Sequence, residues 1–570
     1  MNAPRVKALA PFAALFAALS AAVLIHAQTR DAKPDAALGE RIYREGILPS
    51  GKAVRANVQG DVEVEGTQLN CAGCHRRSGF GSSEGAAFVP AVTGMTLYSA
   101  KLQNGADNFR RLFQEVQPAR FRARVREPRP RPAYTVEALA AALREGVDPT
   151  GRALDPLMPR YRLSEEEARH LAAYLKTLSA APSPGVTRDE IHFATVVAGD
   201  VSPEKRRAML EVMNAYFRWK NAETIHLRQR PGRAGPYRED FLDASREWVL
   251  HVWELKGAPE TWPAQLDAHY RARPVFALLG GVGDDWRPVH DFCERNEVPC
   301  LFPNTDEPVV STDNFYSLYL SKGLTVEAEA LARYLNEESR PAEPTRVVQV
   351  YRDAGGAAVL ARALRRSLQE RAATDLSDRI IGANQKLPRD FWKSLLEEER
   401  PTALILWLGV EDLKTLELAD AAAANSVRQL FVSYGLVGDS PQFPADGLRD
   451  KIYLTYPFAL PSAEGPHVYR VRAWLRSKGV APTREERLQL NTYFALAVAE
   501  HSLTRLAGNF FRDYFVESVE QETESTTNPG VFPHPSLGPG QRFASKGCYV
   551  VRPSARAQGG LEAASGWLVP

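Results

Sequence analysis

The sequence predicts a multidomain protein in which an all-α domain is followed by a larger α/β domain. At ~150 residues per domain, its 570 residues make several folded units. Residues 181–187 have the small, proline- and glycine-containing composition of a linker. After them, short apolar runs alternate with helical patterns, which is typical of βαβ units. All nine tryptophans lie beyond this linker, so the two parts also differ in composition.

The overall composition excludes several classes of protein. Charged residues make up 25% and hydrophobic residues 44%, as in ordinary globular proteins. The net charge of +2 gives no reason to expect a nucleic-acid partner. Five cysteines are too few for a disulfide scaffold, so their positions are more informative than their number.

Residues 1–27 have the features of a cleaved export signal. Two basic residues precede an apolar run over 8–25, and Ala27 offers a small residue at a cleavage point. A retained anchor is the alternative, because the run is near the lower limit of a spanning length. Pro11 interrupts the run, however, and favours cleavage. We therefore expect a periplasmic protein without stable membrane insertion after the signal is removed.

We expect a first domain at 31–180, a second at 188–553 and a C-terminal tail at 554–570. Strands are expected in the second domain at 191–198, 248–254, 275–280, 346–351, 403–408 and 429–434. Helices are expected at 203–221 and 324–338.

Cys71, Cys74 and His75 form a C-x-x-C-H motif, which is the attachment site of a c-type haem. Two thiols at this spacing can each form a thioether with the haem edge, and the adjacent imidazole can then ligate the iron. A redox-active dithiol or half of a zinc site is the alternative, but no second cysteine pair accompanies the motif. The sequence therefore predicts one covalently bound haem c.

The second axial ligand is predicted to be Met158. This residue lies in a loop fixed by two prolines, L-D-P-L-M-P-R-Y, which can hold a sulfur atom at constant geometry. Met95 is the alternative within the first domain. Met209 and Met213 lie beyond the linker on an apolar helix face, where methionine usually packs in the core.

The last helix of the first domain has clear sequence signals. Ser164 and Glu167 predict a capping box at its start. An apolar stripe follows at helical spacing and consists of Leu171, Tyr174, Leu175 and Leu178. His170 lies off this stripe, and we expect it to face solvent.

These features resemble the class I c-type cytochromes over residues 36–180. The resemblance implies an electron-transfer domain in which the first and last helices cross at Gly39 and Tyr174. It also implies that the carbonyl group of Pro90 orients the proximal imidazole. Residues 47–70 are an insertion relative to that family. The arginine-rich stretch 110–131 is either a solvated loop or a docking patch for an acidic redox partner.

Residues 188–553 resemble the type I periplasmic solute-binding proteins of the branched-chain amino acid receptor class. The stretches A-L-L-G-G-V-G at 277–283 and V-P-C-L-F-P-N-T at 298–305 carry this resemblance. It implies two α/β lobes with a ligand cleft between them, to which Thr305 and Asp306 are candidate contributors. Asp284 and Asp285 replace the neutral donors of that family's first cleft loop, and their charges would oppose an anionic ligand. The alternative for Asp284 is a cap on the next helix.

The sequence thus predicts a periplasmic electron carrier whose second domain recognises a small molecule or docks a redox partner protein. The alternative is a solute receptor of an ABC transporter, or a redox-linked ligand sensor. No nucleophile, metal or phosphate-loop constellation indicates a catalytic site. Cys293 and Cys300 flank a helix-to-strand connection in an exported chain and are predicted to form a disulfide. Cys548 is left over, in an expected strand at 547–551.

Overall fold

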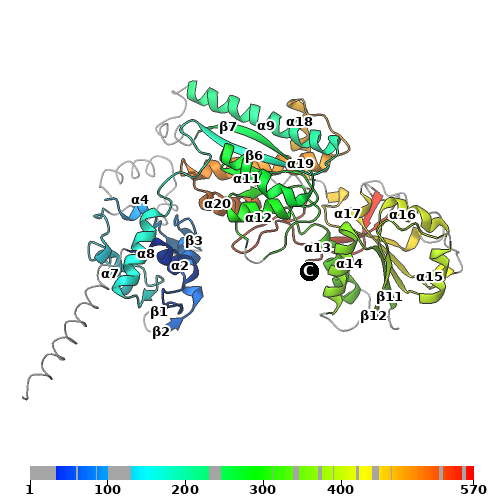
Figure 1. The fold of residues 1–570 in the computed structure, drawn as a ribbon, viewed down its shortest axis with the longest axis horizontal. Coiled ribbons are helices and arrows are strands. Elements are labelled where there is room, and N and C mark those ends of the chain that lie inside the picture. The colour runs from blue at the N-terminus through cyan, green and yellow to red at the C-terminus, as the bar shows by residue number, and fades with distance from the viewer. Residues whose placement is uncertain are drawn as a thin grey trace, which may run out of the picture. The chain divides into compact units, whose positions relative to one another are not determined.

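In a computed structural model the chain folds into two compact units, Met1–Ala181 and Pro182–Pro570 (Figure 1). The structure describes residues 34–58, 62–84, 87–100, 130–229, 245–311, 314–337, 346–369, 375–388, 390–418, 423–438, 449–463, 465–525, 531–554, 557 and 560–570. The expected export signal and residues 110–129 of the arginine-rich stretch lie outside the described residues. Among the described residues, no helix is long and apolar enough to cross a membrane.

The first unit is built mainly from helices. They are α2 (Ala36–Glu45), α3 (Cys71–His75), α4 (Gly94–Leu97), α7 (Val136–Arg144) and α8 (Glu165–Thr177). A three-stranded antiparallel sheet accompanies them in the order β2-β1-β5, with β1 at Arg55–Val58, β2 at Val62–Glu65 and β5 at Arg160–Tyr161. A hairpin of β3 (Ser82–Glu84) and β4 (Ala87–Val89) completes the unit.

Helices α2 and α8 cross at a glycine. A Cβ atom at Gly39 would lie 2.0 Å from the carbonyl oxygen of His170 and 2.9 Å from the Cβ of Tyr174, so only glycine allows this approach. The rings of Tyr43 and Tyr174 meet beside it, 5.4 Å between centroids. The capping box of Ser164 begins α8, as its sequence predicts.

The prediction that His170 faces solvent was wrong. This side chain is 6% exposed, and its Nδ1 accepts a hydrogen bond from the backbone N–H of Asp35 at 2.9 Å. The imidazole thus links the start of α2 to α8.

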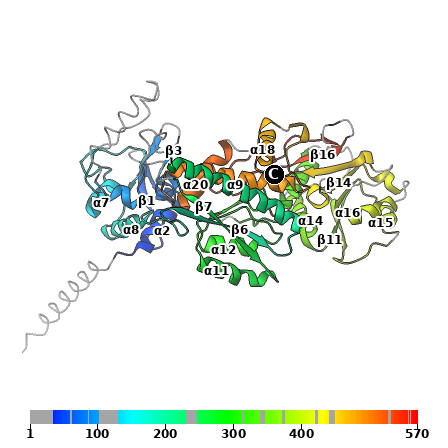
Figure 2. The same ribbon diagram turned by 90° about the horizontal axis from the view of Figure 1, so that it is seen from above.

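The second unit contains two sheets. The sheet of the first lobe has the order β10-β9-β8-β6-β7 and is parallel throughout. Its strands are β6 (Glu190–Ala198), β7 (Glu247–Leu255), β8 (Ala277–Leu279), β9 (Cys300–Leu301) and β10 (Ser317–Leu318). Side chains alternate along β6, so that Phe193 packs into one core with helix α9 (Pro203–Gln229). Val196 packs into another with α11 (Trp262–Ala272) and α12 (Arg287–Arg295), so helices cover both faces of this sheet (Figure 2).

The sheet of the second lobe has the order β12-β11-β13-β14-β15-β16-β17. Its strands are β11 (Arg346–Arg352), β12 (Asp375–Ile381), β13 (Ala403–Trp407), β14 (Gln429–Ser433), β15 (Ile452–Tyr456), β16 (Tyr549–Pro553) and β17 (Leu561–Ala563). The first five in this order are parallel, and β16 and β17 are antiparallel additions. Its helices are α13 (Leu324–Glu337), α14 (Gly355–Gln369), α15 (Phe391–Glu399), α16 (Val410–Lys414) and α17 (Tyr434–Val437).

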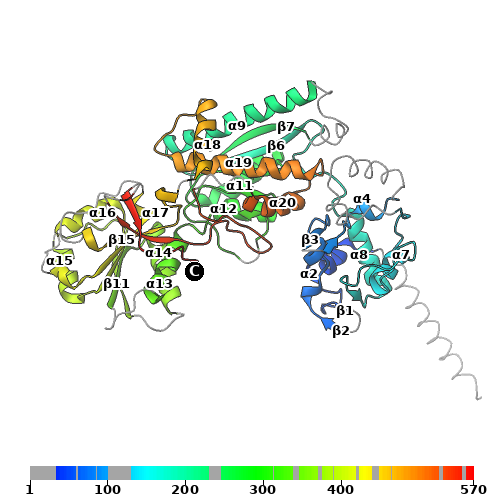
Figure 3. The same ribbon diagram turned by 180° about the vertical axis from the view of Figure 1, so that it is seen from behind.

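The chain passes between the lobes more than once. After β15 it returns to the core of the first lobe as α18 (Pro466–Ser477), α19 (Glu486–Leu506) and α20 (Arg512–Ser525). Helix α19 packs against α9 and α20 there (Figure 3). The chain then re-enters the second lobe as β16 and β17. This is the two-lobed α/β architecture with crossing segments that the sequence predicts.

All seven expected strands of the second unit form, the one expected at 547–551 as β16, whereas β10, β12, β15 and β17 were not expected. Strand β17 lies within residues 554–570, which the sequence analysis assigns to a tail. Part of the expected linker is bound to the second unit, because the N–H of Ser183 donates to the carbonyl of Phe510. The carbonyl of Gly185 likewise accepts from the N–H of His192.

Candidate functional site

Helix α3 presents the C-x-x-C-H motif as little more than one helical turn. The side-chain oxygen of Asn70 caps it by accepting a hydrogen bond from the N–H of Gly73 at 2.7 Å. Arg76 ends it with a φ of 66°. A spacing of three residues places Cys71 and Cys74 on the same face of the helix.

His75 is oriented by a single backbone acceptor. Its Nδ1–H donates to the carbonyl oxygen of Pro90 at 2.9 Å, the contact that the resemblance implies. The other ring nitrogen, Nε2, is then the one left for a metal. Partial burial lowers the pKa of His75 below its usual value. The neutral imidazole, which is the ligating form, is thereby favoured.

The surroundings of the motif fit a haem better than a redox-active dithiol. Burial raises the pKa of the Cys71 thiol to about 12, whereas reactive dithiols have a lowered thiol pKa. Both Cys71 and Met158 border the apolar core of the first unit. The Nε of Arg76 is buried without a hydrogen-bond partner in the described part of the chain, and a haem brings carboxylates that such a donor can bind.

A multidentate metal site is not formed elsewhere in the part of the chain that the structure describes. No group of three or more His, Cys, Asp or Glu side chains lies close enough to hold a metal ion there.

The loop that carries Met158 is held by local hydrogen bonds. The N–H of Met158 donates to the carbonyl of Asp155 at 3.1 Å, and the N–H of Leu157 donates to the Asp155 carboxylate at 3.0 Å. The Met158 side chain packs against the core, whereas Met95, at the start of α4, is 60% exposed. Met209 and Met213 are fully buried in the core of the second unit.

The inserted segment 47–70 reaches the Met158 loop, a contact that the sequence analysis missed. Strand β1 lies within it and pairs with β5, which directly follows Met158 and Pro159. A signal was present in the sequence, because R-E-G-I-L-P-S-G-K-A-V at 44–54 matches R-E-G-V-D-P-T-G-R-A-L at 144–154. Both copies form the same bridged turn after a helix, and the two copies lead into β1 and into the Met158 loop.

The two candidate ligand loops of the first lobe lie side by side. Asp284 and Asp285 follow β8, and Thr305 and Asp306 follow β9. The hydroxyl of Thr305 donates to the carbonyl of Asp284 at 3.2 Å, which joins the loops. The suggestion that Asp284 caps α12 was wrong, because Trp286 is the N-cap residue and makes no side-chain capping bond. The carboxylate that reaches the start of α12 is that of Asp285, which accepts from the N–H of Arg287 at 3.3 Å.

These loops are electrostatically acidic. Asp306 keeps an exposed surface, but surrounding protein atoms displace part of its hydration. This desolvation, reinforced by the charge of Asp284, raises its carboxyl pKa against the opposing effect of Lys205. Desolvation and the neighbouring charges of Asp284 and Asp306 likewise raise the pKa of Glu307. The carboxylates thus repel one another at the loop ends.

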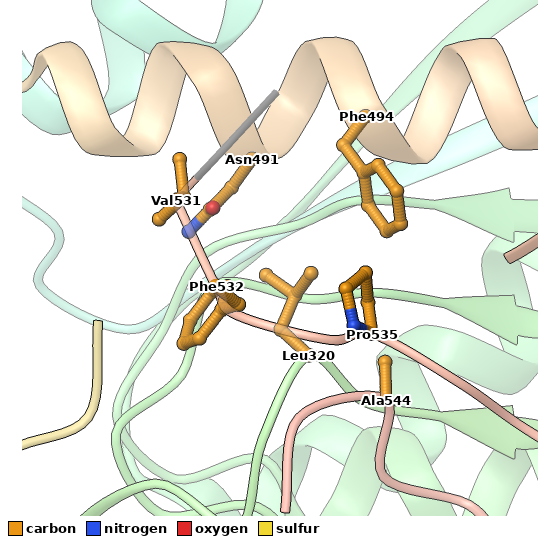
Figure 4. A pocket seen from close by; sticks show the side chains of 7 residues that line it. All are labelled: Leu320, Asn491, Phe494, Val531, Phe532, Pro535 and Ala544. Carbon is orange, nitrogen blue, oxygen red and sulfur yellow. The ribbon is translucent and has the colours of Figure 1, made fainter. Parts of the chain in front are cut away.

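A small pocket, with room for about one water molecule, lies near these loops, between α19 and the segment 531–544 (Figure 4). It is lined by Leu320, Asn491, Phe494, Val531, Phe532, Pro535 and Ala544. Asn491 and Phe494 project into it from α19. The Asn491 amide donates to the side-chain oxygen of Asn304, next to Thr305, at 3.1 Å. None of the four candidate loop residues lines this pocket.

Cys293 and Cys300 are both buried, and the structure has both as free thiols. Burial and a hydrogen bond to Cys300 raise the pKa of the Cys293 thiol. Cys548 is also buried and free, directly before β16. A disulfide between Cys293 and Cys300 is therefore not formed in the structure and stays a proposal.

Comparisons with known proteins separate the two units. Residues 65–179 match the family model Cytochrome c. No curated protein matches the chain. Solved structures also match part of the chain at low identity.

A fatty acid ABC transporter substrate-binding protein from Thermomonospora curvata is 15% identical, with a TM-score of 0.47, over 68% of this chain and 95% of the other. A leucine-binding protein from Thermotoga maritima is 13% identical, with a TM-score of 0.46, over 67% and 99%. A putative branched-chain amino acid ABC transporter protein from Rhodospirillum rubrum is 14% identical, with a TM-score of 0.46, over 67% and 100%. Residues 65–179 thus form a cytochrome c domain, and a separate α/β unit with two sheets follows it in the chain.

Proposed function

We propose that this protein is a periplasmic electron carrier with one covalent haem c. Cys71 and Cys74 would form the thioethers, and His75 and Met158 would ligate the iron. The hydrogen bond from His75 Nδ1–H to the Pro90 carbonyl carries this proposal, because it leaves Nε2 for the iron. When bound, the haem supplies one-electron redox chemistry at its iron.

The chain's own residues would hold that iron in a closed coordination. The Pro90 carbonyl fixes the plane of the imidazole and increases its basicity. A thioether as the other ligand would raise the reduction potential and exclude small molecules from the iron. The contact of Met158 with the core, against the exposure of Met95, supports Met158 as that ligand.

The axial assignment is tested by visible spectroscopy on the full-length holoprotein. The ferric protein should show the weak far-red sulfur-to-iron band, and Met158→Ala should lose it and bind carbon monoxide when reduced. Met95→Ala is the matched control and should keep the band. A Met158→Ala protein that keeps the band, beside a Met95→Ala protein that loses it, would reverse the assignment.

For the second unit, we propose recognition of a neutral or cationic small ligand, or docking of a redox partner. The acidic loop ends support this, since an anion within ~4 Å of one carboxylate is opposed by ~4 kcal/mol at an effective dielectric of 20. Calorimetry on the full-length protein should therefore show no tight binding of leucine, isoleucine or valine. Micromolar binding would instead support a transport receptor.

A solute receptor or redox-linked sensor is the second candidate. Trp286, which is buried directly after Asp285, supplies the readout for this candidate, because a ligand-induced change in the loop would alter its fluorescence. Tryptophan fluorescence that responds to a ligand while the haem potential stays constant would support the receptor. A potential that shifts with the ligand would support the sensor.

A further inference from the structure

The inserted segment pairs with the chain just beyond Met158. Ala56 lies opposite Tyr161 and Asn57 lies opposite Arg160 in the antiparallel register of β1 and β5. The N–H of Arg162 donates to the carbonyl of Arg55 at 2.9 Å and extends the ladder. Backbone pairing therefore holds the exit of the Met158 loop.

Tyr161 connects this exit to the haem attachment helix. The side chain is 7% exposed, and its hydroxyl donates to the carbonyl of Leu69 at 2.8 Å. Leu69 lies just before Cys71, so one side chain spans the two segments that carry the proposed iron ligands. Burial raises the pKa of Tyr161, which keeps its hydroxyl a donor.

Arg160 ties the carbonyl groups of the Met158 loop together. Its guanidinium donates to the carbonyls of Met158, Leu154 and Asp155, the latter two at 3.3 Å and 3.4 Å. Gly146 makes room for it, because a Cβ there would lie 2.0 Å from the Arg160 Nε. The planar guanidinium suits several carbonyls at fixed angles, which an ammonium does not.

We propose that β1, Leu69, Arg160 and Tyr161 form a methionine clamp that keeps the Met158 sulfur on the iron. Arg160 and Tyr161 are then positioning residues, and the insertion at 47–70 is what makes the clamp possible. This inference rests on the proposed function, and it adds what holds the sulfur ligand in place.

The test follows the far-red sulfur-to-iron band of the full-length ferric holoprotein as the pH is raised. Tyr161→Phe removes the donor but keeps the ring. Loss of one hydrogen bond should favour the sulfur-free iron about fivefold, which lowers the midpoint of band loss by ~0.7 pH unit for a one-proton transition. Arg160→Met should lower it further, and Arg160→Lys should recover only part of that loss.

Arg162→Ala is the control, because it removes only an exposed ion pair with Glu63 and should keep the wild-type midpoint. A wild-type protein without the band would overturn the proposed axial ligand itself. A wild-type protein with the band, together with Tyr161→Phe and Arg160→Met midpoints equal to it, would overturn the clamp alone. Lowered midpoints in all variants including Arg162→Ala would also overturn it, because they would show general loosening.

Discussion

The carbonyl oxygen of His170 lies 2.0 Å from the place that a Cβ on Gly39 would occupy. Backbone touches backbone at this point of the α2–α8 crossing. The nearest atoms of His170 belong to its backbone and not to a flexible side chain. An added carbon on Gly39 must therefore push one helix away from the other. The buried ring of Tyr174 on the same side limits that movement.

Gly39→Ala should therefore loosen the first unit. Overpacking of this kind costs about 1–3 kcal/mol. Hydrogen exchange measured by mass spectrometry should become at least ~fivefold faster in peptides covering α2 and α8. Ala37→Ser, at an exposed position of α2, is the control and should leave exchange unchanged. Equal exchange in Gly39→Ala and wild type would contradict the tight crossing.

Glu327 should make the second unit less stable as the pH rises. Its buried carboxylate accepts from Ser433 at 2.8 Å, Thr455 at 2.5 Å and the N–H of Gly435 at 3.1 Å. Burial outweighs these bonds and raises the pKa to about 7. The folded state therefore binds more protons than the unfolded state between its usual pKa of 4.5 and about 7. Stability should fall by about 3 kcal/mol across that window.

Glu327→Gln isolates this effect. Urea unfolding followed by tryptophan fluorescence reports on the second unit, which holds every tryptophan. The free energy of unfolding should change much less between pH 5 and pH 8 in Glu327→Gln than in the wild type. Glu329→Gln, on the same helix but paired with Lys322, is the control and should keep the wild-type dependence. The same dependence in Glu327→Gln would show that another group titrates.

Glu520 and Arg542 form a buried ion pair in the second unit. The Oε1 atom of Glu520 lies 2.7 Å from the Nη1 atom of Arg542, and the two side chains are 3% and 5% exposed, respectively. Glu520→Gln should cost about 3–5 kcal/mol in urea unfolding, because it leaves the guanidinium buried without its counter-charge. The double variant Glu520→Leu with Arg542→Met should recover most of that loss. A double variant no more stable than Glu520→Gln would contradict this explanation.

The proposed periplasmic location predicts a disulfide between Cys293 and Cys300, because that compartment is oxidising. Closing this loop would contribute about 2.5 kcal/mol in the chain-entropy model. After unfolding and alkylation without reductant, mass spectrometry should find Cys548 modified and the other two unmodified. Alkylation of both Cys293 and Cys300 would show that they remain the free thiols of the structure.

Local signals carried most of the correct predictions. The C-x-x-C-H motif, the capping box at Ser164 and the strand runs each depend on neighbouring residues, so the sequence alone indicates them. The environment of His170 does not follow from its neighbours, because its partner Asp35 lies at the other end of the domain. The pairing of β1 with β5 is likewise long-range, and alternation along so short a strand does not specify a partner.

In the loops of the second unit, too, neighbouring residues do not specify every contact. Asp284 and Asp285 are adjacent, and a capping pattern does not distinguish which carboxylate reaches the N–H of Arg287. The place of β17 was missed because a three-residue strand has no period of its own. Only its register against β16, with Ala563 opposite Val551, makes it a strand.

The late arrival of β16 has a consequence for biosynthesis. Leu454 of β15 pairs with Val551, which is translated long after it. Until then β15 presents an open strand edge, the kind of surface on which nascent chains aggregate. A premature stop or a proteolytic nick before β16 would therefore produce an aggregation-prone fragment, although the last helix of its first unit already ends at Thr177.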